Sequence, residues 1–214
     1  MATKGRNVEI TIERFAVGPL ETNCYVVQGV ENRALVFDPS LEPVAVVDYL
    51  QKTGLEVAGV VLTHGHFDHI LGIEAILRFA PQAGVWCHRD EVLLLRESKY
   101  NGSAMIGVEY HYDGTLNEFD EGVLDVGGYT MTVIHIPGHS PGGCAFVMGK
   151  HCLVGDALFA GSIGRSDFPG GDGELLVNGI KEKLLSLPED TICYPGHGGR
   201  TTIAREKRHN PFLV

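Results

Sequence analysis

Three histidines and one aspartate stand close together in residues 63–69, which read Thr-His-Gly-His-Phe-Asp-His. This run directly follows the apolar stretch 57–62. Imidazole nitrogen and carboxylate oxygen are the ligands that zinc and similar divalent metals prefer. Burying such groups without partners would cost roughly 2–7 kcal/mol for even a neutral polar group. The run therefore predicts a metal site at the end of a strand, with a solvated histidine-rich loop as the alternative.

Three further polar residues occupy similar places later in the chain. His139, Asp156 and His197 each follow a short apolar run, in a turn marked by glycine or proline. Strand ends deliver side chains to a shared edge, and functional residues concentrate on such turns. Each of the three, taken alone, is compatible with an ordinary turn residue. Together with residues 63–69 they predict one shared site.

The candidate ligands outnumber the four positions that one tetrahedral ion offers. They are His64, His66, Asp68, His69, His139, Asp156 and His197. Two divalent ions would use all of them: His64, His66 and His139 would hold one ion. Asp68, His69 and His197 would hold the other, and Asp156 would bridge the two. Two metals about 3.5–4 Å apart can hold a hydroxide between them and lower its pKa toward ~7.

The order His-x-His-x-Asp-His, followed by His, Asp and His, resembles the metallo-β-lactamase superfamily from Asp38 to His197. The resemblance implies an α/β fold, an αββα sandwich of two packed mixed sheets with helices on the outer faces. It also implies that Asp38 supports the ligand loop from behind the metal ligands. Residues 155–171 and 209–213 are similar to the short bacterial glyoxalase II-like subgroup, which carries the bridging aspartate that true β-lactamases lack.

The resemblance implies a metal-dependent hydrolase that cleaves a small-molecule thioester with a metal-bridging hydroxide. Its cofactors would be two divalent ions, with zinc expected and iron or manganese as options, and Asp68 would be a catalytic ligand. A thiol of pKa near ~8.5 can leave as thiolate without a general acid, and the sequence offers no obvious acid beyond the ligands. Arg165, Phe168 and Tyr110 are candidate substrate residues, with loop ordering, core packing and surface exposure as alternatives.

Two other activities remain open. Residues 164–168 also resemble the persulfide dioxygenases, which use one iron ion held by two histidines and an aspartate. A lactone hydrolase would use the same metal set. The chain ends at Val214, so we expect a single domain over residues 1–214 without the C-terminal extension that helps full-length glyoxalase II bind glutathione.

The composition and net charge of the chain disfavour some classes of function. The 214 residues are 44% hydrophobic and carry a net charge of −10, which disfavours binding to nucleic acid. No apolar run approaches the ~18–20 residues that span a bilayer. Five scattered cysteines without a Cys-x-x-Cys pair favour a reducing compartment, and we expect a cytoplasmic protein.

Hydrophobic periodicity predicts an alternating order of strands and helices. The predicted strands cover residues 8–15, 24–30, 33–37, 57–62, 85–87, 123–126, 129–135, 144–148, 151–155 and 191–194. The predicted helices cover residues 43–54, 70–80, 90–97 and 176–187. Residues 98–113 show no period, contain three tyrosines and a histidine, and are predicted to form a long loop that contributes to function.

Overall fold

Two six-stranded sheets form the centre of the computed structural model, which describes residues 10–214. In the first sheet the strands follow one another in chain order, antiparallel from β1 to β3 and parallel from β3 to β6. Its strands are β1 (Thr11–Val17), β2 (Thr22–Gln28), β3 (Arg33–Phe37), β4 (Glu56–Val61), β5 (Gly84–His88) and β6 (Leu116–Phe119). The start of the first predicted strand, residues 8 and 9, lies outside the described residues.

The second sheet has the order β14-β13-β10-β9-β8-β7, and its one parallel pair is β10 with β13. Its strands are β7 (Gly122–Val126), β8 (Tyr129–His135), β9 (Cys144–Met148), β10 (His151–Gly155), β13 (Ile192–Pro195) and β14 (Thr201–Thr202). A small hairpin pairs β11 (Leu158–Phe159) with β12 (Ser162–Ile163).

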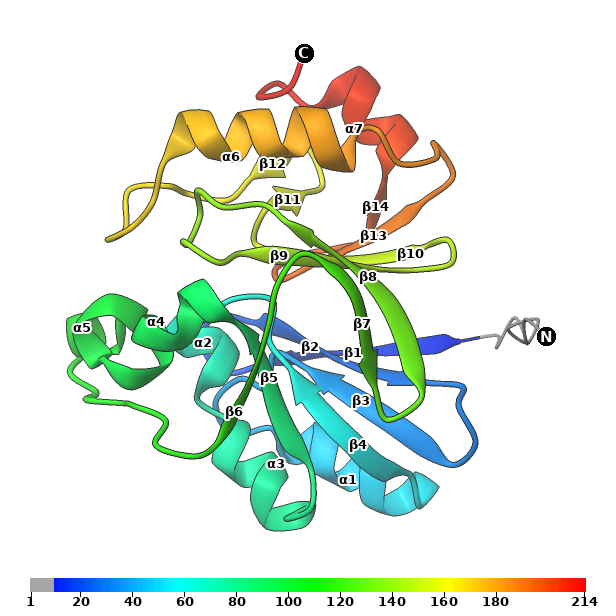
Figure 1. The fold of residues 1–214 in the computed structure, drawn as a ribbon, viewed down its shortest axis with the longest axis vertical. Helices are drawn as coiled ribbons and strands as arrows, with labels where there is room; N and C mark the ends of the chain where they lie inside the picture. Colours follow the sequence, from blue (N-terminus) through cyan, green and yellow to red (C-terminus); the bar gives the residue numbers. More distant parts are fainter. Residues whose placement is uncertain (1–9) are drawn as a thin grey trace.

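Helices cover the outer faces of both sheets (Figure 1). Helices α1 and α3 lie against the first sheet, and α6 and α7 lie against the second. The helices are α1 (Val44–Thr53), α2 (Phe67–Ile70), α3 (Ile73–Phe79), α4 (Val92–Arg96), α5 (Ser98–Asn101), α6 (Gly173–Gly179) and α7 (Ile203–His209). Short 3₁₀ turns cover Arg89–Glu91 and Ser103–Ile106, and a π-helical turn, Ile180–Leu184, extends α6.

Alternation along the strands explains the layers. In β3, Ala34 and Val36 belong to the apolar cluster beneath α1 and α3, whereas Leu35 and Phe37 belong to the cluster between the two sheets. Successive strand residues point to opposite faces, so a strand that is apolar throughout must be covered on both sides. A third cluster, which includes Leu176, lies between the second sheet and its helices. The predicted αββα sandwich is confirmed.

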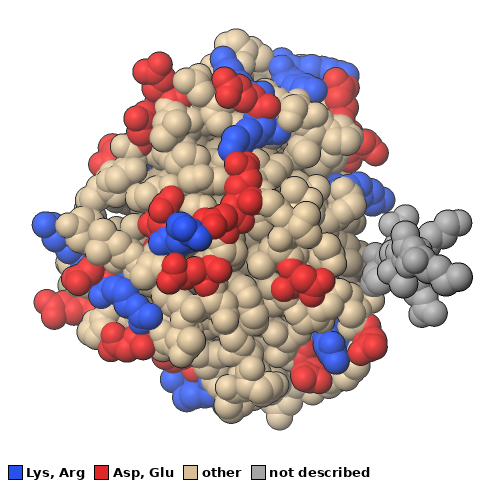
Figure 2. Space-filling model, in the orientation of Figure 1, with Lys and Arg blue, Asp and Glu red and all other residues tan. Residues whose placement is uncertain are grey.

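This architecture brings the polar turns together. The 63–69 run follows β4, and residues 139, 156 and 197 follow β8, β10 and β13. The parallel strands β3 and β4 of one sheet and β10 and β13 of the other end at the same side of the sandwich. On the face shown in Figure 2, Lys and Arg side chains are scattered among Asp and Glu rather than gathered in one patch.

Some predicted elements differ from the observed ones. The helix predicted over 70–80 is α3, which begins only at Ile73; Ile70 is the last residue of the preceding helix α2, and Leu71 and Gly72 separate the two helices. A Cβ at Gly72 would lie 2.1 Å from the Ser40 carbonyl oxygen, a contact made by a distant segment. The predicted loop 98–113 contains α5 and the turn Ser103–Ile106. Strands β6 and β14 and helix α7 were not predicted, and none of the described helices is long and apolar enough to cross a bilayer.

Candidate metal centre

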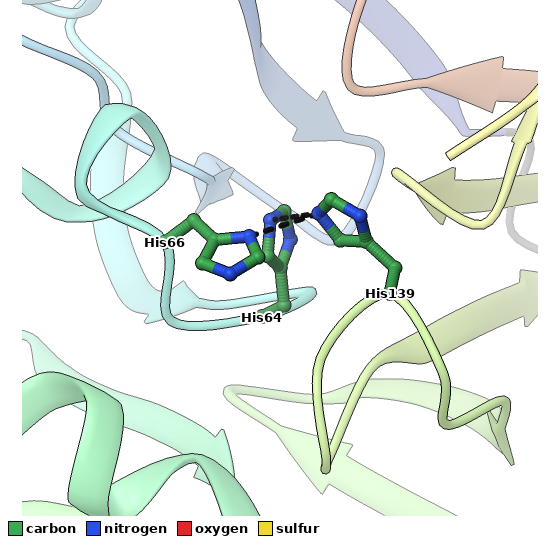
Figure 3. A group of neighbouring side chains, drawn as sticks. All are labelled: His64, His66 and His139. Atoms are coloured by element: carbon green, nitrogen blue, oxygen red, sulfur yellow. Dashed lines mark hydrogen bonds between the residues drawn. The ribbon is translucent and has the colours of Figure 1, made fainter. Parts of the chain in front are cut away.

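His64, His66 and His139 converge on one point from two separate loops (Figure 3). His139 Nε2 lies 2.9 Å from His66 Nδ1 and 3.2 Å from His64 Nε2. His139 Nδ1 lies 2.7 Å from the carbonyl oxygen of Arg165, which can only accept a hydrogen bond. Nδ1 therefore carries the proton, and Nε2 presents its lone pair to the other two rings. Ring nitrogens facing one another in this way suit a shared cation.

Asp68, His69 and His197 form a second group. Asp68 Oδ2 lies 3.4 Å from His69 Nε2 and 3.2 Å from His197 Nε2. His69 Nδ1 donates to Asp38 Oδ2 at 3.0 Å, and His197 Nδ1 donates to the Leu20 carbonyl oxygen at 3.2 Å. These partners fix both rings in the tautomer that turns the Nε2 lone pair toward Asp68.

Asp156 lies between the two groups. Its Oδ2 is 3.6 Å from His139 Nε2 and 3.5 Å from His197 Nε2, and its Oδ1 is 3.4 Å from His69 Nε2. A Cβ at residue 196 would lie only 2.0 Å from Asp156 Oδ1, so the close approach of β13 to this carboxylate requires Gly196. The seven predicted ligands thus meet in one place, with Asp156 within reach of both groups.

Burial and charge in the centre fit a bound cation. Burial lowers the pKa of His66 to about 3 and lowers that of His64 well below its ordinary value, so both rings are neutral, as ligands must be. Burial opposes a charge on His69, but the carboxylates of Asp68, Asp156 and Asp38 raise its pKa well above the ordinary value. The same negative charge favours a metal ion.

Unpartnered atoms support the same assignment. The buried atoms His69 Nε2 and Asp156 Oδ1 have no hydrogen-bond partner. Such groups are costly unless they are paired or coordinate a metal. The donor set of imidazole and carboxylate therefore fits two divalent ions, one at His64, His66 and His139 and one at Asp68, His69 and His197.

Asp38 lies directly behind the ligands. Its backbone takes the left-handed conformation, with φ of 49°, immediately after β3. The carboxylate accepts the Thr63 N–H at 2.8 Å through Oδ1, and Oδ2 accepts the Thr63 hydroxyl at 2.6 Å as well as His69. Asp38 therefore orients one ligand and anchors the start of the loop that carries the others.

Two supporting residues escaped the sequence reasoning. Glu91 is fully buried and accepts the backbone N–H of Gly65 at 2.6 Å and that of Gly142 at 2.5 Å. Burial raises its pKa, although those two N–H groups oppose the shift. Thr22 donates its hydroxyl to Asp68 Oδ2 at 2.8 Å. Neither residue stands in a recognisable pattern, because each reaches the centre only through the tertiary fold.

A cavity of about 540 Å³ opens beside the ligands. Arg165 and Phe168 line it, as do Asp68, His139 and Asp156. The Arg165 guanidinium lies 4.0 Å from the centre of the Phe168 ring, which packs against His66 at 5.1 Å between ring centres. The cavity gives a small molecule access to the candidate ligand atoms.

Tyr110 does not line this cavity. Its hydroxyl lies 2.8 Å from Glu74 Oε2 and 3.1 Å from the Ile70 carbonyl oxygen, and its ring packs on the core beneath the first sheet. Burial raises its pKa, as does the Glu74 carboxylate. The structure thus places Tyr110 as a support for α2 and α3, in contrast to the substrate role predicted from sequence.

The sequence model of the metallo-beta-lactamase superfamily matches residues 17–197, a span that includes all seven ligands. The chain belongs to the metallo-β-lactamase superfamily. A probable metallo-hydrolase of Bacillus subtilis, YqgX, is 37% identical over 94% of this chain and 96% of its own length. The hydroxyacylglutathione hydrolase GloC of Haemophilus influenzae is 35% identical over 95% of this chain and 98% of its own length.

Two solved structures of the superfamily resemble this one throughout. The B3 metallo-beta-lactamase BLEG-1 has a TM-score of 0.91 and 37% identity, covering 95% of this chain and all of that one. TTHA1623, solved in a di-iron-bound form, has a TM-score of 0.85 and 35% identity, covering 94% of this chain and all of that one. The fold is that of the superfamily, the chain is a metal-dependent hydrolase, and the ligand groups support a site for two metals.

Proposed function

We propose that this metallo-β-lactamase superfamily member hydrolyses small-molecule thioesters at a centre of two divalent ions, zinc or, failing that, iron or manganese. The observation that carries the proposal is the set of titratable groups at the cavity. Apart from the metal ligands, Arg165 is the one titratable side chain among the described residues that line it. A reaction that needs no proton donor for its leaving group is therefore favoured.

The residues next to Arg165 do not supply a proton either. Asp167 accepts two hydrogen bonds from the guanidinium, at 2.6 and 2.7 Å, and this lowers the Asp167 pKa to about 2. It is therefore a carboxylate at neutral pH. A thiolate, from a thiol of pKa near ~8.5, departs unaided, whereas an amide nitrogen must be protonated as it leaves.

Two bound divalent ions supply Lewis acidity, which polarises a substrate carbonyl and lowers the pKa of water toward ~7. The chain orients that chemistry through hydrogen bonds behind the ligands. The Arg165 carbonyl fixes His139, Asp38 fixes His69, and the Leu20 carbonyl fixes His197. Such partners typically contribute about 10–100-fold to metal affinity or activity.

Asp68 is held as a carboxylate beside the cavity. Burial opposes its charge, but His69, His197 and the Thr22 hydroxyl hold its pKa well below the usual range. Those three groups gather at Oδ2. Oδ1 is then the Asp68 oxygen left to accept a hydrogen bond from the attacking water and so to orient it, which is the catalytic role that we propose for Asp68.

The similarity to GloC, whose name denotes hydrolysis of a hydroxyacylglutathione, supports thioester chemistry in this chain as well. The five cysteines are all buried thiols within the described residues, which favours a reducing compartment, and we place the enzyme in the cytoplasm.

The test is a matched series of acyl compounds. One acyl group is offered as the thioester, oxygen ester and amide of the same carrier, beside S-lactoylglutathione, a lactone and a cephalosporin. We expect kcat/KM for the thioester to exceed that for the amide by on the order of 10³-fold or more, about 4 kcal/mol. Comparable rates on the cephalosporin and the thioester would overturn the proposal, and so would oxygen uptake with a persulfide in place of hydrolysis.

A further inference from the structure

The cavity beside the ligands is walled by apolar side chains. Those that come from outside the ligand set are Leu20, Phe67, Met105, Ile106, Phe159, Ile163 and Phe168. They derive from four separate segments of the chain, so the apolar surface is assembled by the fold. Binding sites of this size are typically apolar with a few polar groups that orient the ligand.

Several of these side chains face water. Met105 is 73% exposed, Ile106 is 54% exposed and Leu20 is 50% exposed. Single exposed apolar residues are normal, but these three line one cavity next to a reactive centre. Met105 and Ile106 lie on the short turn after α5, inside the segment that sequence reasoning singled out for its tyrosines. The apolar residues of that segment, not its aromatic ones, reach the cavity.

The cavity also lacks a free positive charge among the described residues. Arg165 is the one Lys or Arg that lines it. Its guanidinium forms two hydrogen bonds with Asp167 and stacks on Phe168, so its charge is already compensated. A carboxylate carried on the acyl group would find no unpaired cation there apart from the metals.

We infer that the acyl group of the substrate is apolar, a linear or aromatic chain of roughly six carbons or more, seated against Ile106, Met105 and Phe168. This inference rests on the proposed thioester hydrolysis and names the substrate class for it. The reacting carbonyl lies at the metal ligands and the acyl tail extends along the apolar wall. The thiol carrier is then directed to the open side of the cavity.

Kinetics on N-acetylcysteamine thioesters test the inference. Each methylene removed from water should raise kcat/KM by up to about fourfold. Because the wall is partly open, we expect hexanoyl to exceed acetyl by at least about tenfold, and adipoyl, which ends in a carboxylate, to fall well below hexanoyl. Equal values for acetyl and hexanoyl, with both turned over, would overturn the inference while leaving thioester hydrolysis intact.

A binding measurement keeps the two proposals separate. The thioethers S-hexyl- and S-ethyl-N-acetylcysteamine cannot be hydrolysed, so calorimetry with the metal-loaded protein reports affinity alone. We expect the hexyl compound to bind at least about tenfold more tightly than the ethyl one. If no thioester is turned over but this preference holds, the reaction is wrong and the apolar site is right. Equal affinities overturn the apolar site.

Matched variants test which side chains form the apolar wall of the cavity. Ile106→Ser should lower the hexanoyl-to-acetyl ratio by roughly fivefold or more, whereas Leu93→Ser should leave the ratio unchanged. Leu93 is 51% exposed on α4, close to the exposure of Ile106, but it does not line the cavity. Asp167→Asn should raise the adipoyl-to-hexanoyl ratio, because it frees the Arg165 charge. Unfolding midpoints and metal content are measured for each variant, and unchanged ratios in folded, metal-loaded Ile106→Ser and Asp167→Asn overturn the inference.

Discussion

The two halves of the metal centre differ in burial and in what holds them. His64 and His139 are buried, and their ring nitrogens meet those of His66 within the protein. In the other half, the His197 side chain is 30% exposed, and a carboxylate replaces one imidazole. The half formed by His64, His66 and His139, the all-histidine half, is therefore the more buried, and the half formed by Asp68, His69 and His197, the mixed half, is the more open to solvent.

The residues that hydrogen-bond to the ligands and their loops also differ between the two halves. Glu91 joins the two loops of the all-histidine half by accepting one backbone N–H from each. In the mixed half, the partners come from the turn between β1 and β2 and from the start of β2. The Leu20 carbonyl oxygen accepts a hydrogen bond from His197, and the Thr22 hydroxyl donates one to Asp68. Leu20 is also half-exposed at the cavity. We therefore expect the mixed half to lose its metal first.

The most damaging substitution should be one that removes the contact between the halves. Asp156→Ala should lower kcat/KM by on the order of 10³-fold, about 4 kcal/mol, and loosen both metals, since Asp156 faces ligands of both groups. Elemental analysis and kinetics on the same sample check this. Near-normal turnover in Asp156→Ala would show that the halves act independently.

Removing one histidine from each half should separate them. His197→Ala should leave about one metal per chain, retained at His64, His66 and His139, and His66→Ala should release the metal of the more buried half. Competition with a chelator, followed by metal analysis, gives the two retained affinities. If the two variants lose metal in the same order and amount, the contrast between the halves is wrong.

Glu91→Gln should lower both the metal affinity of the all-histidine half and the free energy of unfolding. The amide can accept only one of the two buried N–H groups, and leaving the other unpaired costs about 1–3 kcal/mol in the free energy of unfolding. Denaturant unfolding and metal titration measure the two effects. Glu206→Gln is the control, because Glu206 is also fully buried and accepts the Gly161 N–H. It should lower stability without releasing metal from the all-histidine half.

Thr22→Val should have the smallest effect of these substitutions, a loss of metal affinity in the mixed half alone. It removes the hydroxyl that donates to Asp68, and such partners contribute about tenfold or more to metal affinity. Thr130→Val removes a similar hydrogen bond, 2.9 Å to Asp125 between two exposed residues of the second sheet, and should leave metal binding unchanged. Equal affinities in both variants would mean that Thr22 does not support the mixed half.

The candidate ligands that the fold brings together could be picked out from the sequence because their signals are local. The 63–69 run shows its spacing directly, and His139, Asp156 and His197 are marked by the apolar runs and glycines beside them. The sheets could be predicted for the same reason, since strands such as β3 are apolar over consecutive residues, here 34–37.

The remaining features depend on contacts between distant segments. Glu91 accepts backbone hydrogen bonds from Gly65 and Gly142, and the Ser40 carbonyl oxygen leaves no room for a side chain at Gly72. The residues next to Glu91 and Gly72 in the sequence give no sign of either contact. The three tyrosines of 98–113 suggested a binding loop, but the hydrogen bonds of Tyr110 to α2 and α3 decide its place. The separation of α2 from α3 at Gly72 has the same origin.

The number of metal ions per chain tests the central claim most directly. Protein purified without added metal is analysed for zinc, iron and manganese. The metal content should approach two ions per chain, because two groups of three ligands flank Asp156, which faces both groups. The same measurement on His197→Ala should approach one. A firm value of one iron per wild-type chain, unchanged when zinc, manganese or iron is supplied in excess, would contradict the two-metal account and favour oxygen chemistry over hydrolysis.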